Sequence, residues 1–242
     1  MPGILLRPPV SDPKASVIKK ASENVVRWNG SLQQDGQEVP LFRLYHRDAF
    51  CPRPNQVRRY GPVSRYDHHA NHPPGKTDSV GSIYLARTIG TAVAEVFGEA
   101  SPAMLCDHWS LAKIHIIDEP FIFNLSGVAS MKAGAYASIL ALDRLDSQAW
   151  AREIYKAHRK VVGIHYLSSH DYGECLVIRE SGEPHLQIAR HNSGDWDHGI
   201  NALPPLERVE FKKAFDERGL SFKIPKDKGF SCGPCADPNR HP

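Results

Sequence analysis

Three short segments of the chain concentrate the side chains that could do chemistry. The first has Arg65 followed by an aspartate and three histidines, the second contains Glu95, and the third carries Ser168 and Ser169. The segments span residues 62–72, 80–97 and 163–170. An arginine can hold phosphate groups through charge-assisted hydrogen bonds, and a carboxylate can stabilise a cationic transition state. Taken singly, such residues are more often solvent-exposed surface, so their role depends on whether the fold brings them together.

Histidines and cysteines raise the separate question of a metal. His68, His69 and His72 would share one face if their loop were helical, but no matching carboxylate or cysteine set is nearby. We therefore expect polar loop residues and no metal, with His68 close enough to contact a substrate. Cys232 and Cys235 form a thioredoxin-like Cys-x-x-Cys motif, yet they lie in a tail without the strand and helix that such a motif needs. They are interpreted as an adventitious pair, with metal binding beside a histidine as the alternative.

Arginines crowd the segment before the first histidines. Arg53, Arg58, Arg59 and Arg65 fall in one long connection, and Arg43 lies in the strand predicted before it. Such a cluster could contact nucleic-acid phosphates, but aromatic residues for base stacking are few there. A substrate with two phosphates is the simpler interpretation, with Arg43 as a further phosphate ligand.

The elements that must position these residues follow from hydrophobic periodicity and turn residues. Strands are predicted at residues 40–46, 80–86, 111–117, 121–125, 161–167, 174–178 and 185–189. Helices are predicted at 17–28, from Thr88 or Thr91 to 99, at 130–142, 147–160 and 205–218. In the second of these helices Glu95 falls roughly opposite the apolar side. Because the strands bunch together without regular alternation with helices, we expect an α+β fold with a mostly antiparallel sheet and flanking helices.

Composition narrows the class of protein. The chain has 242 residues, of which 41% are hydrophobic and 24% charged, as in ordinary globular domains. A net charge of +3 is too small to indicate nucleic-acid binding by itself, and five cysteines do not suggest a disulfide framework. With no long apolar run and no signal-peptide pattern, we expect a cytoplasmic protein with no membrane partner. The predicted organisation is an arm over 1–38, a catalytic domain over 39–225 and a tail over 226–242.

In this order the three segments resemble the RES domain family. The resemblance rests on Arg-Tyr-Asp-His at 65–68, Tyr-Leu-Ala at 84–86 with Ala-Glu-Val-Phe at 94–97, and Tyr-x-Ser at 166–168. Members of that family are NAD-consuming toxins, usually paired with a DNA-binding antitoxin. Their fold is related to the ADP-ribosyltransferases, so the resemblance implies an ADP-ribosyltransferase-like α+β fold here. The family has no glycine-rich phosphate loop, and none is found in this sequence.

Carried over residue by residue, the resemblance assigns roles to four positions. It makes Glu95 the catalytic glutamate, Arg65 the family arginine, Tyr84 the pocket tyrosine and Ser168 the serine, with Ser169 as a weaker candidate for that serine. In the implied reaction Glu95 stabilises the cationic ribosyl centre while nicotinamide leaves as a neutral ring, so no general acid is needed. Arg65 would hold the pyrophosphate, Tyr84 would stack on nicotinamide, and Ser168 would orient Glu95 or a ribose.

The resemblance thus predicts an enzyme that cleaves the nicotinamide–ribose bond of NAD and inhibits growth. NAD is expected as its substrate, with water or phosphate as acceptor, and an antitoxin protein is expected to cover the active site. Nucleic acid would be reached only indirectly, through the antitoxin. Three alternatives remain: an ADP-ribosyltransferase that modifies a specific protein, a nucleic-acid-binding module that uses the loop 53–65, and a metal-dependent protein that uses the histidines and the cysteine pair.

Overall fold

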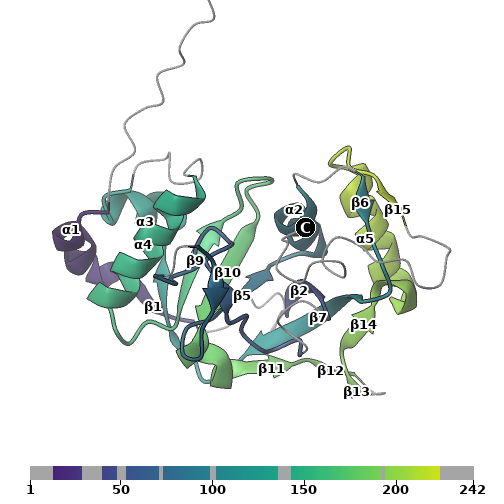
Figure 1. The fold of residues 1–242 in the computed structure, drawn as a ribbon, viewed down its shortest axis with the longest axis horizontal. Coiled ribbons are helices and arrows are strands. Elements are labelled where there is room, and N and C mark those ends of the chain that lie inside the picture. The colour runs from purple at the N-terminus through teal and green to yellow at the C-terminus, as the bar shows by residue number, and fades with distance from the viewer. Residues whose placement is uncertain are drawn as a thin grey trace, which may run out of the picture.

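A large sheet with helices against one of its faces organises the protein (Figure 1). The structure, a computed structural model, describes residues 13–28, 40–47, 53–70, 73–98, 102–135, 143–191 and 194–223. The α-helices are α1 (Ala15–Lys20), α2 (Ile89–Phe97), α3 (Gly127–Lys132), α4 (Arg144–Ala157) and α5 (Pro205–Asp216). Short 3-10 helices are η1 (Ser22–Asn24), η3 (Glu180–His185) and η4 (Ile200–Ala202).

The described strands of the large sheet number nine and run in the order β1-β8-β9-β10-β5-β2-β7-β11, with β14 also paired to β7. They are β1 (Val25–Arg27), β2 (Leu41–His46), β5 (Ser82–Ala86), β7 (Trp109–Ile116), β8 (Phe121–Asn124), β9 (Gly163–Leu167), β10 (Glu174–Arg179), β11 (Leu186–Ile188) and β14 (Asp197–Gly199). Within this sheet only the β8–β9 pair is parallel. The α+β fold class, with a mostly antiparallel sheet and flanking helices, is therefore confirmed.

Six further strands of two residues each form three small pairs beside the sheet. They are β3 (Tyr60–Gly61) with β4 (Gly75–Lys76), β6 (Ala103–Met104) with β15 (Phe222–Lys223), and β12 (Arg190–His191) with β13 (Gly194–Asp195). None of these short strands is predicted from the sequence, because two residues are too few to show a period.

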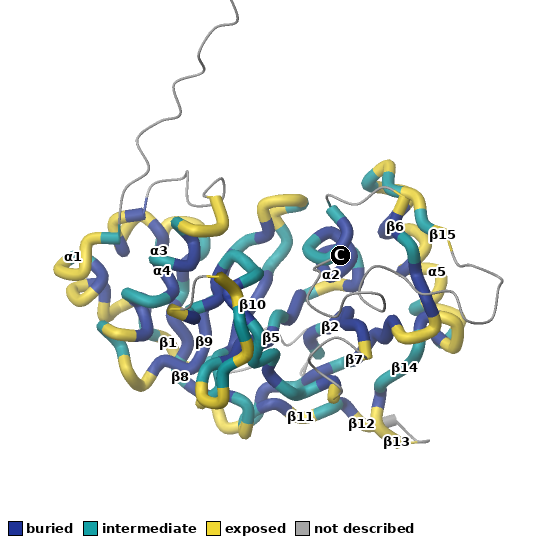
Figure 2. The backbone as a smooth tube through the Cα atoms, viewed as in Figure 1, coloured by how far each residue is buried: buried dark blue, intermediate teal, exposed yellow. Residues whose placement is uncertain are grey.

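The two faces of the sheet carry separate hydrophobic cores. The larger core unites alternate strand residues with α1, α2, α4 and α5, through side chains such as Ile18, Val93, Trp150 and Phe215. The smaller core lies on the opposite face and is made mainly of the other strand residues, among them Leu85, Ile114 and Leu176. Figure 1 shows α1, α3 and α4 gathered at one end of the sheet and α2 with α5 at the other. In Figure 2 the strands of the sheet and α2 are mostly buried or intermediate, and exposed segments lie on α1, α4 and α5 and in the loops.

Helix α2 begins where the sequence predicts it. The hydroxyl oxygen of Thr88 accepts a hydrogen bond of 3.0 Å from the backbone N–H of Thr91, which satisfies one of the free donors of the first turn. Ile89, Val93 and Phe97 are buried against the sheet and α5. Glu95, roughly opposite this stripe, is only partly exposed and accepts a hydrogen bond from Tyr166 of β9.

The first described segment differs from its prediction. A helix over 17–28 is predicted, but the chain forms α1, then η1, and then strand β1 at the edge of the sheet. Val25 pairs with Phe123 of β8, because a β-branched residue packs better on a pleated surface than in a helix. Residues 13–28, assigned by the sequence to an arm, thus contribute Ile18 to the larger core. The remainder of the arm, the tail 226–242 with Cys232 and Cys235, and residues 136–142 lie outside the described residues.

Gly163 allows β9 to lie between β8 and β10, and this yields a first prediction. A Cβ at Gly163 would lie 2.7 Å from the carbonyl oxygen of Val177 and 2.5 Å from the Cδ1 of Ile178. Gly163→Ala should therefore lower the free energy of unfolding by about 1–3 kcal/mol, as overpacking does. Gly199→Ala in β14 is the control, since its nearest neighbours would be 3.9 Å away. Urea unfolding of both variants checks this, and equal stability of the two would contradict it.

Candidate active site on the helix-covered face of the sheet

Three neighbouring strands present polar side chains to the face that α2 covers. Tyr84 of β5, Tyr166 of β9 and Cys175 of β10 all lie on the side of the larger core. In the strand register Cys175 is directly opposite Tyr166, and Tyr84 is opposite Val177, two residues further along β10. Side chains at such positions are neighbours across the sheet, so the fold brings Tyr84 and Tyr166 to the same region.

Glu95 reaches this region from helix α2. Its Oε2 accepts a hydrogen bond of 3.0 Å from the hydroxyl of Tyr166. Its Oε1 is shielded from solvent and has no hydrogen-bond partner among the described residues. A carboxylate with one oxygen held and the other unused is both oriented and still able to accept a hydrogen bond from a ligand.

Arg65 and Tyr66 enter the same region from the long connection between β3 and β4. The rings of Tyr66 and Tyr166 lie 4.5 Å apart between centroids, and Tyr66 is fully buried. The guanidinium carbon of Arg65 lies 5.6 Å from the centre of the Tyr66 ring. We call Arg65, Tyr66, Tyr84, Glu95 and Tyr166 the candidate site.

Asp67 fixes the loop that carries Arg65. Its buried carboxylate accepts two hydrogen bonds from Arg58, of 3.0 and 2.7 Å, and others from the backbone N–H groups of Val63 and Ser64. It also accepts a bond of 2.9 Å from the hydroxyl of Tyr84. The Tyr84 oxygen in turn accepts a bond of 3.1 Å from the backbone N–H of the residue after Arg65. These bonds tie the loop to strand β5, and the backbone bridge between Arg58 and Ser82 joins the preceding residues to the same strand.

The electrostatics of the candidate site keep its tyrosines protonated. Burial raises the pKa of Tyr66 to about 12, while nearby Arg65 lowers it and Glu95 raises it. Burial and the adjacent Glu95 carboxylate also raise the pKa of Tyr166 well above its usual value. Tyr166 therefore acts as a hydrogen-bond donor to Glu95 and not as a base.

Asp67, unlike these tyrosines, is ionised. Burial alone would raise its pKa, but the Arg58 guanidinium and the N–H groups of Ser64 and Val63 hold the pKa of Asp67 below its usual range. Asp67 is thus ionised and its acceptor capacity is used by the protein itself, so it serves the loop and not a ligand.

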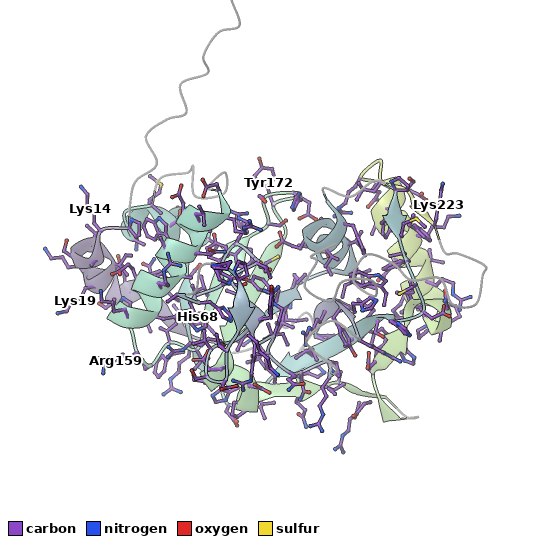
Figure 3. The ribbon with its side chains drawn as sticks, in the orientation of Figure 1. Lys14, Lys19, His68, Arg159, Tyr172 and Lys223 are labelled. Atoms are coloured by element: carbon purple, nitrogen blue, oxygen red, sulfur yellow. The ribbon has the colours of Figure 1, made fainter. Side chains whose placement is uncertain are left out.

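His68 has a defined partner beside the candidate site. Its Nε2 lies 3.0 Å from an oxygen of Glu180, and its ring is 4.9 Å from that of Tyr155. Burial would raise the pKa of Glu180, yet the hydrogen bond from His68 lowers the pKa of Glu180 overall. Figure 3 shows His68 among the side chains near the centre of the molecule, whereas the exposed Tyr172, between β9 and β10, stands at the periphery.

The structure does not bring every predicted residue to the candidate site. Arg43 lies in β2 and donates hydrogen bonds to the carbonyl oxygens of residues 53, 54 and 56, so it pins the following loop. Ser168 is fully buried, and its hydroxyl oxygen accepts a 3.1 Å bond from the N–H of His170 within the β9–β10 turn. Ser169 is exposed. Within the described part of the chain, no hydrogen bond joins Ser168 to Glu95, and Tyr166 holds that carboxylate instead.

Four contributors were missed by sequence reasoning as site residues: Arg58, Tyr66, Asp67 and Tyr166. Three of them lie inside the motifs at 65–68 and 166–168, so their position in those motifs was the available signal. Arg58 has no such signal, because its role depends on a carboxylate nine residues later that only the fold brings to it.

Residues 40–199 match the family model of the RES domain. The chain belongs to the RES domain family. The match contains every residue of the candidate site and ends before α5. Among solved structures, this RES domain is similar to a chain of the M. tuberculosis MbcT-MbcA toxin-antitoxin complex, with 15% identity and a TM-score of 0.49. That likeness covers 82% of this chain and 98% of the other. The comparison with curated proteins gives no match.

No helix of the described segments is long and apolar enough to cross a bilayer.

The Asp67 network yields a prediction for stability. Asp67→Asn leaves Arg58 without its buried counter-charge, so the free energy of unfolding should fall by about 3–5 kcal/mol. The exposed Asp78→Asn, between β4 and β5, is the control and should change little. Because the pKa of Asp67 is lowered by folding, its stabilisation is fully present above the ordinary aspartate range and is lost as the pH falls through the folded pKa.

Chemical denaturation at neutral and at acidic pH tests both statements. The difference in stability between the parent protein and Asp67→Asn should shrink as the pH falls below about 4. A difference that stayed constant down to the acid unfolding transition would show that Asp67 is not the ionised partner of Arg58.

Proposed function

We propose that this RES domain is an enzyme that cleaves the bond between nicotinamide and ribose in NAD. The observation that carries the proposal is the state of Glu95: one carboxylate oxygen is held by Tyr166, and the other is shielded and has no partner among the described residues. A fixed negative charge with a free acceptor fits the needs of a cationic ribosyl centre. Membership of the RES family supports NAD as the substrate through the resemblance described above.

In the proposed reaction the C–N bond to nicotinamide breaks and its electron pair stays on the leaving ring nitrogen. Nicotinamide departs neutral, so no proton has to be supplied, and positive charge develops on the ribosyl carbon and ring oxygen. Glu95 stabilises that charge and accepts a hydrogen bond from a ribose hydroxyl through Oε1. An oxygen of water or phosphate then bonds to the ribosyl carbon, and attacking water gives up a proton.

Arg65 is the proposed ligand of the pyrophosphate. It lies next to Tyr66, and its charge and that of Glu95 act on the same hydroxyl. A guanidinium beside buried aromatic rings is less hydrated than an ammonium in water, and it can make the planar two-point contact that phosphates favour. The charges would thus be complementary to NAD, with the anionic pyrophosphate at Arg65 and the cationic nicotinamide ribose at Glu95.

The tyrosines have separate proposed roles. Tyr166 positions Glu95, and the buried Tyr66 fills the space behind it. The hydroxyl of Tyr84 is occupied by Asp67, so the partly exposed Tyr84 would meet nicotinamide with its ring face only. His68 lies at the side of the site with Glu180, where it would contact the substrate at its periphery.

Nucleic-acid binding through the loop 53–65 receives less support. Arg58 is bound to Asp67, and Arg59 donates to the carbonyl oxygen of Asp78 and lies 3.6 Å from Glu183. Arginines that neutralise the protein's own carboxylates release few counterions on a nucleic acid. Transfer of ADP-ribose to a protein would use the same Glu95 chemistry with a different acceptor, so the identity of the product distinguishes it.

We further propose that the enzyme is a growth-inhibiting toxin neutralised by an antitoxin. The support is the family resemblance, in which a toxin is usually paired with a DNA-binding antitoxin. A protein that covered the loop of Arg65 and the ring of Tyr84 would exclude a dinucleotide, whereas a protein bound elsewhere would leave the site accessible.

Glu95→Gln is the variant that tests the chemistry. It keeps the shape of the side chain but removes the charge, so nicotinamide release should fall about 100-fold or more while the thermal melt is unchanged. Tyr166→Phe should reduce the rate less, because the carboxylate remains but is no longer held. The exposed Glu210→Gln on α5 is the matched control and should release nicotinamide at the parent rate. A Glu95→Gln variant with near-parent turnover would overturn the assignment.

Expression in bacteria tests the toxin proposal. The parent protein should arrest growth and lower cellular NAD, and Glu95→Gln at the same expression level should do neither, because the toxicity follows catalysis. Co-expression of a cognate antitoxin should restore both growth and NAD. Normal growth and normal NAD in cells that contain the folded parent protein would refute the depletion of free NAD.

A further inference from the structure

Three metal-binding side chains meet at the end of β2, and none of them belongs to the candidate site. They are His46, the last residue of β2, and Cys106 and His108, which precede β7. The Nε2 of His46 lies 3.2 Å from the Sγ of Cys106. One ligand atom from each of the three residues lies within 4.8 Å of the other two.

The sheet explains how residues so distant in sequence converge. His46 pairs with Trp109 in the antiparallel register of β2 and β7, and the N–H of Arg47 donates to the carbonyl oxygen of His108. The N–H of Trp109 donates to the carbonyl oxygen of Cys106, which closes a turn over residues 106–109. The turn returns the cysteine to the side of His46.

The three candidate ligands differ in their exposure to solvent. Only 4% of His46 and 5% of Cys106 is exposed, whereas His108 is on the surface. The rings of His46 and Trp109 form a T-shaped pair with centroids 5.3 Å apart, and the ring centroids of His46 and His108 are 5.6 Å apart. An ion held here would be enclosed by apolar groups on one side and reachable from solvent on the side of His108.

The spacing suits a tetrahedral ion. With bonds of about 2.1 Å to nitrogen and about 2.3 Å to sulfur, two ligands at the tetrahedral angle lie about 3.5 Å apart. The distance of 3.2 Å from His46 Nε2 to Cys106 Sγ is near that value. All three ligand atoms lie within 4.8 Å of one another, so the exposed His108 side chain would have to move only slightly toward the other two. Imidazole and thiolate ligands favour zinc over magnesium or calcium, which prefer oxygen.

We propose that His46, Cys106 and His108 bind one Zn²⁺, with the fourth position open to water. On binding, the Cys106 thiol loses its proton to solvent and the thiolate bonds to the metal. The ion joins the end of β2 to the turn 106–109. It thereby supports Trp109, whose ring lies 4.9 Å from that of Phe97 in α2. The proposed effect of the ion is on stability, because it links side chains that are 60 residues apart in the sequence.

This site uses none of the groups that the sequence raised as metal ligands. His46 and Cys106 are 60 residues apart, and no spacing rule joins them. His68 is paired with Glu180, while His72 and the Cys232–Cys235 pair lie outside the described residues. The expectation that the protein carries no metal is therefore replaced by a specific proposal at other residues.

Metal titration of the full chain tests the proposal. Protein freed of metal with a chelator should bind one equivalent of Zn²⁺ in competition with a chromogenic chelator. Co²⁺ in its place should give the sulfur-to-cobalt charge-transfer band and the intense visible bands of a tetrahedral thiolate site. Cys106→Ser should abolish the charge-transfer band. His108→Gln should weaken zinc binding beyond the about 10- to 100-fold that loss of an outer-sphere partner costs.

Two controls exclude other ligands. His170→Gln alters an exposed histidine of the β9–β10 turn and should bind zinc like the parent. A variant with Cys51, Cys232 and Cys235 all replaced by serine should retain the cobalt band, because Cys106 remains. Loss of the band in this variant would assign the metal to those thiols and overturn the proposal.

Thermal unfolding gives a second readout that does not depend on catalysis. Zinc should raise the Tm of the parent protein and of His170→Gln, and it should leave the Tm of His108→Gln nearly unchanged, since a ligand stabilises only the state that binds it. The exposed position of His108 lets this variant fold without the metal. Failure of the parent to bind zinc stoichiometrically at micromolar concentration would refute the site. Nicotinamide release is not part of the test, so its outcome is independent of the proposed function.

Discussion

The buried carboxylate of Asp67 organises the part of the molecule on which the proposed chemistry depends. It accepts five hydrogen bonds, two from Arg58, one from Tyr84 and two from backbone N–H groups. A long connection would ordinarily be held only at its ends. Here the Asp67 carboxylate bonds to Tyr84 of strand β5, and the backbone N–H of Tyr66 bonds to the same tyrosine, so the residues beside Arg65 are held against the sheet.

The two carboxylates of this region show how burial and pairing separate structural from chemical roles. Asp67 is fully buried, and donors from the protein satisfy both of its oxygens. Glu95 is held at one oxygen only, and its other oxygen has no partner among the described residues. An unsatisfied acceptor in a partly dry site costs stability. A protein retains such a group most readily where a ligand completes it, and this is why Glu95, and not Asp67, is the proposed catalytic residue.

Two tyrosine hydroxyls join the sheet to the elements that cover it. Tyr84 joins the loop to β5 and Tyr166 joins α2 to β9, so each hydroxyl connects the sheet to an element that covers it. Strand register places the two tyrosines near each other, and the register depends on β9 fitting closely beside β10 at Gly163. The geometry of the candidate site is therefore a property of the sheet as much as of the loop.

Local sequence patterns predicted most of the longer helices and strands, and the errors arose where long-range contacts decide the structure. Helix α2 was predicted because a threonine cap precedes an apolar stripe, and β2, β5, β7 and β10 correspond to strands predicted at 40–46, 80–86, 111–117 and 174–178. Residues 25–27 were misassigned to a helix because their preference is decided by pairing with β8, which a local window does not contain.

The same limit applies to the site. Glu95 and Arg65 could be named from motif order, and Ser168 was expected to orient either Glu95 or a ribose. The hydrogen bond from Tyr166 to Glu95 was not predicted. Arg43 was predicted as a phosphate ligand from its charge, yet its guanidinium donates hydrogen bonds to carbonyl oxygens of the next loop. His46 and Cys106 gave no signal at all, since only the pairing of β2 with β7 brings them together. Residue types were thus predictable, whereas the partners were not.

The measurement that tests the central claim most directly is the mass of the products formed from NAD by the purified parent protein, with and without phosphate. The account predicts free nicotinamide in both cases, with ADP-ribose as the second product in water or its phosphate ester when phosphate is the acceptor. NAD that remains intact after prolonged incubation with folded protein would contradict it. Cleavage at the pyrophosphate, with nicotinamide still attached to ribose, would contradict it equally.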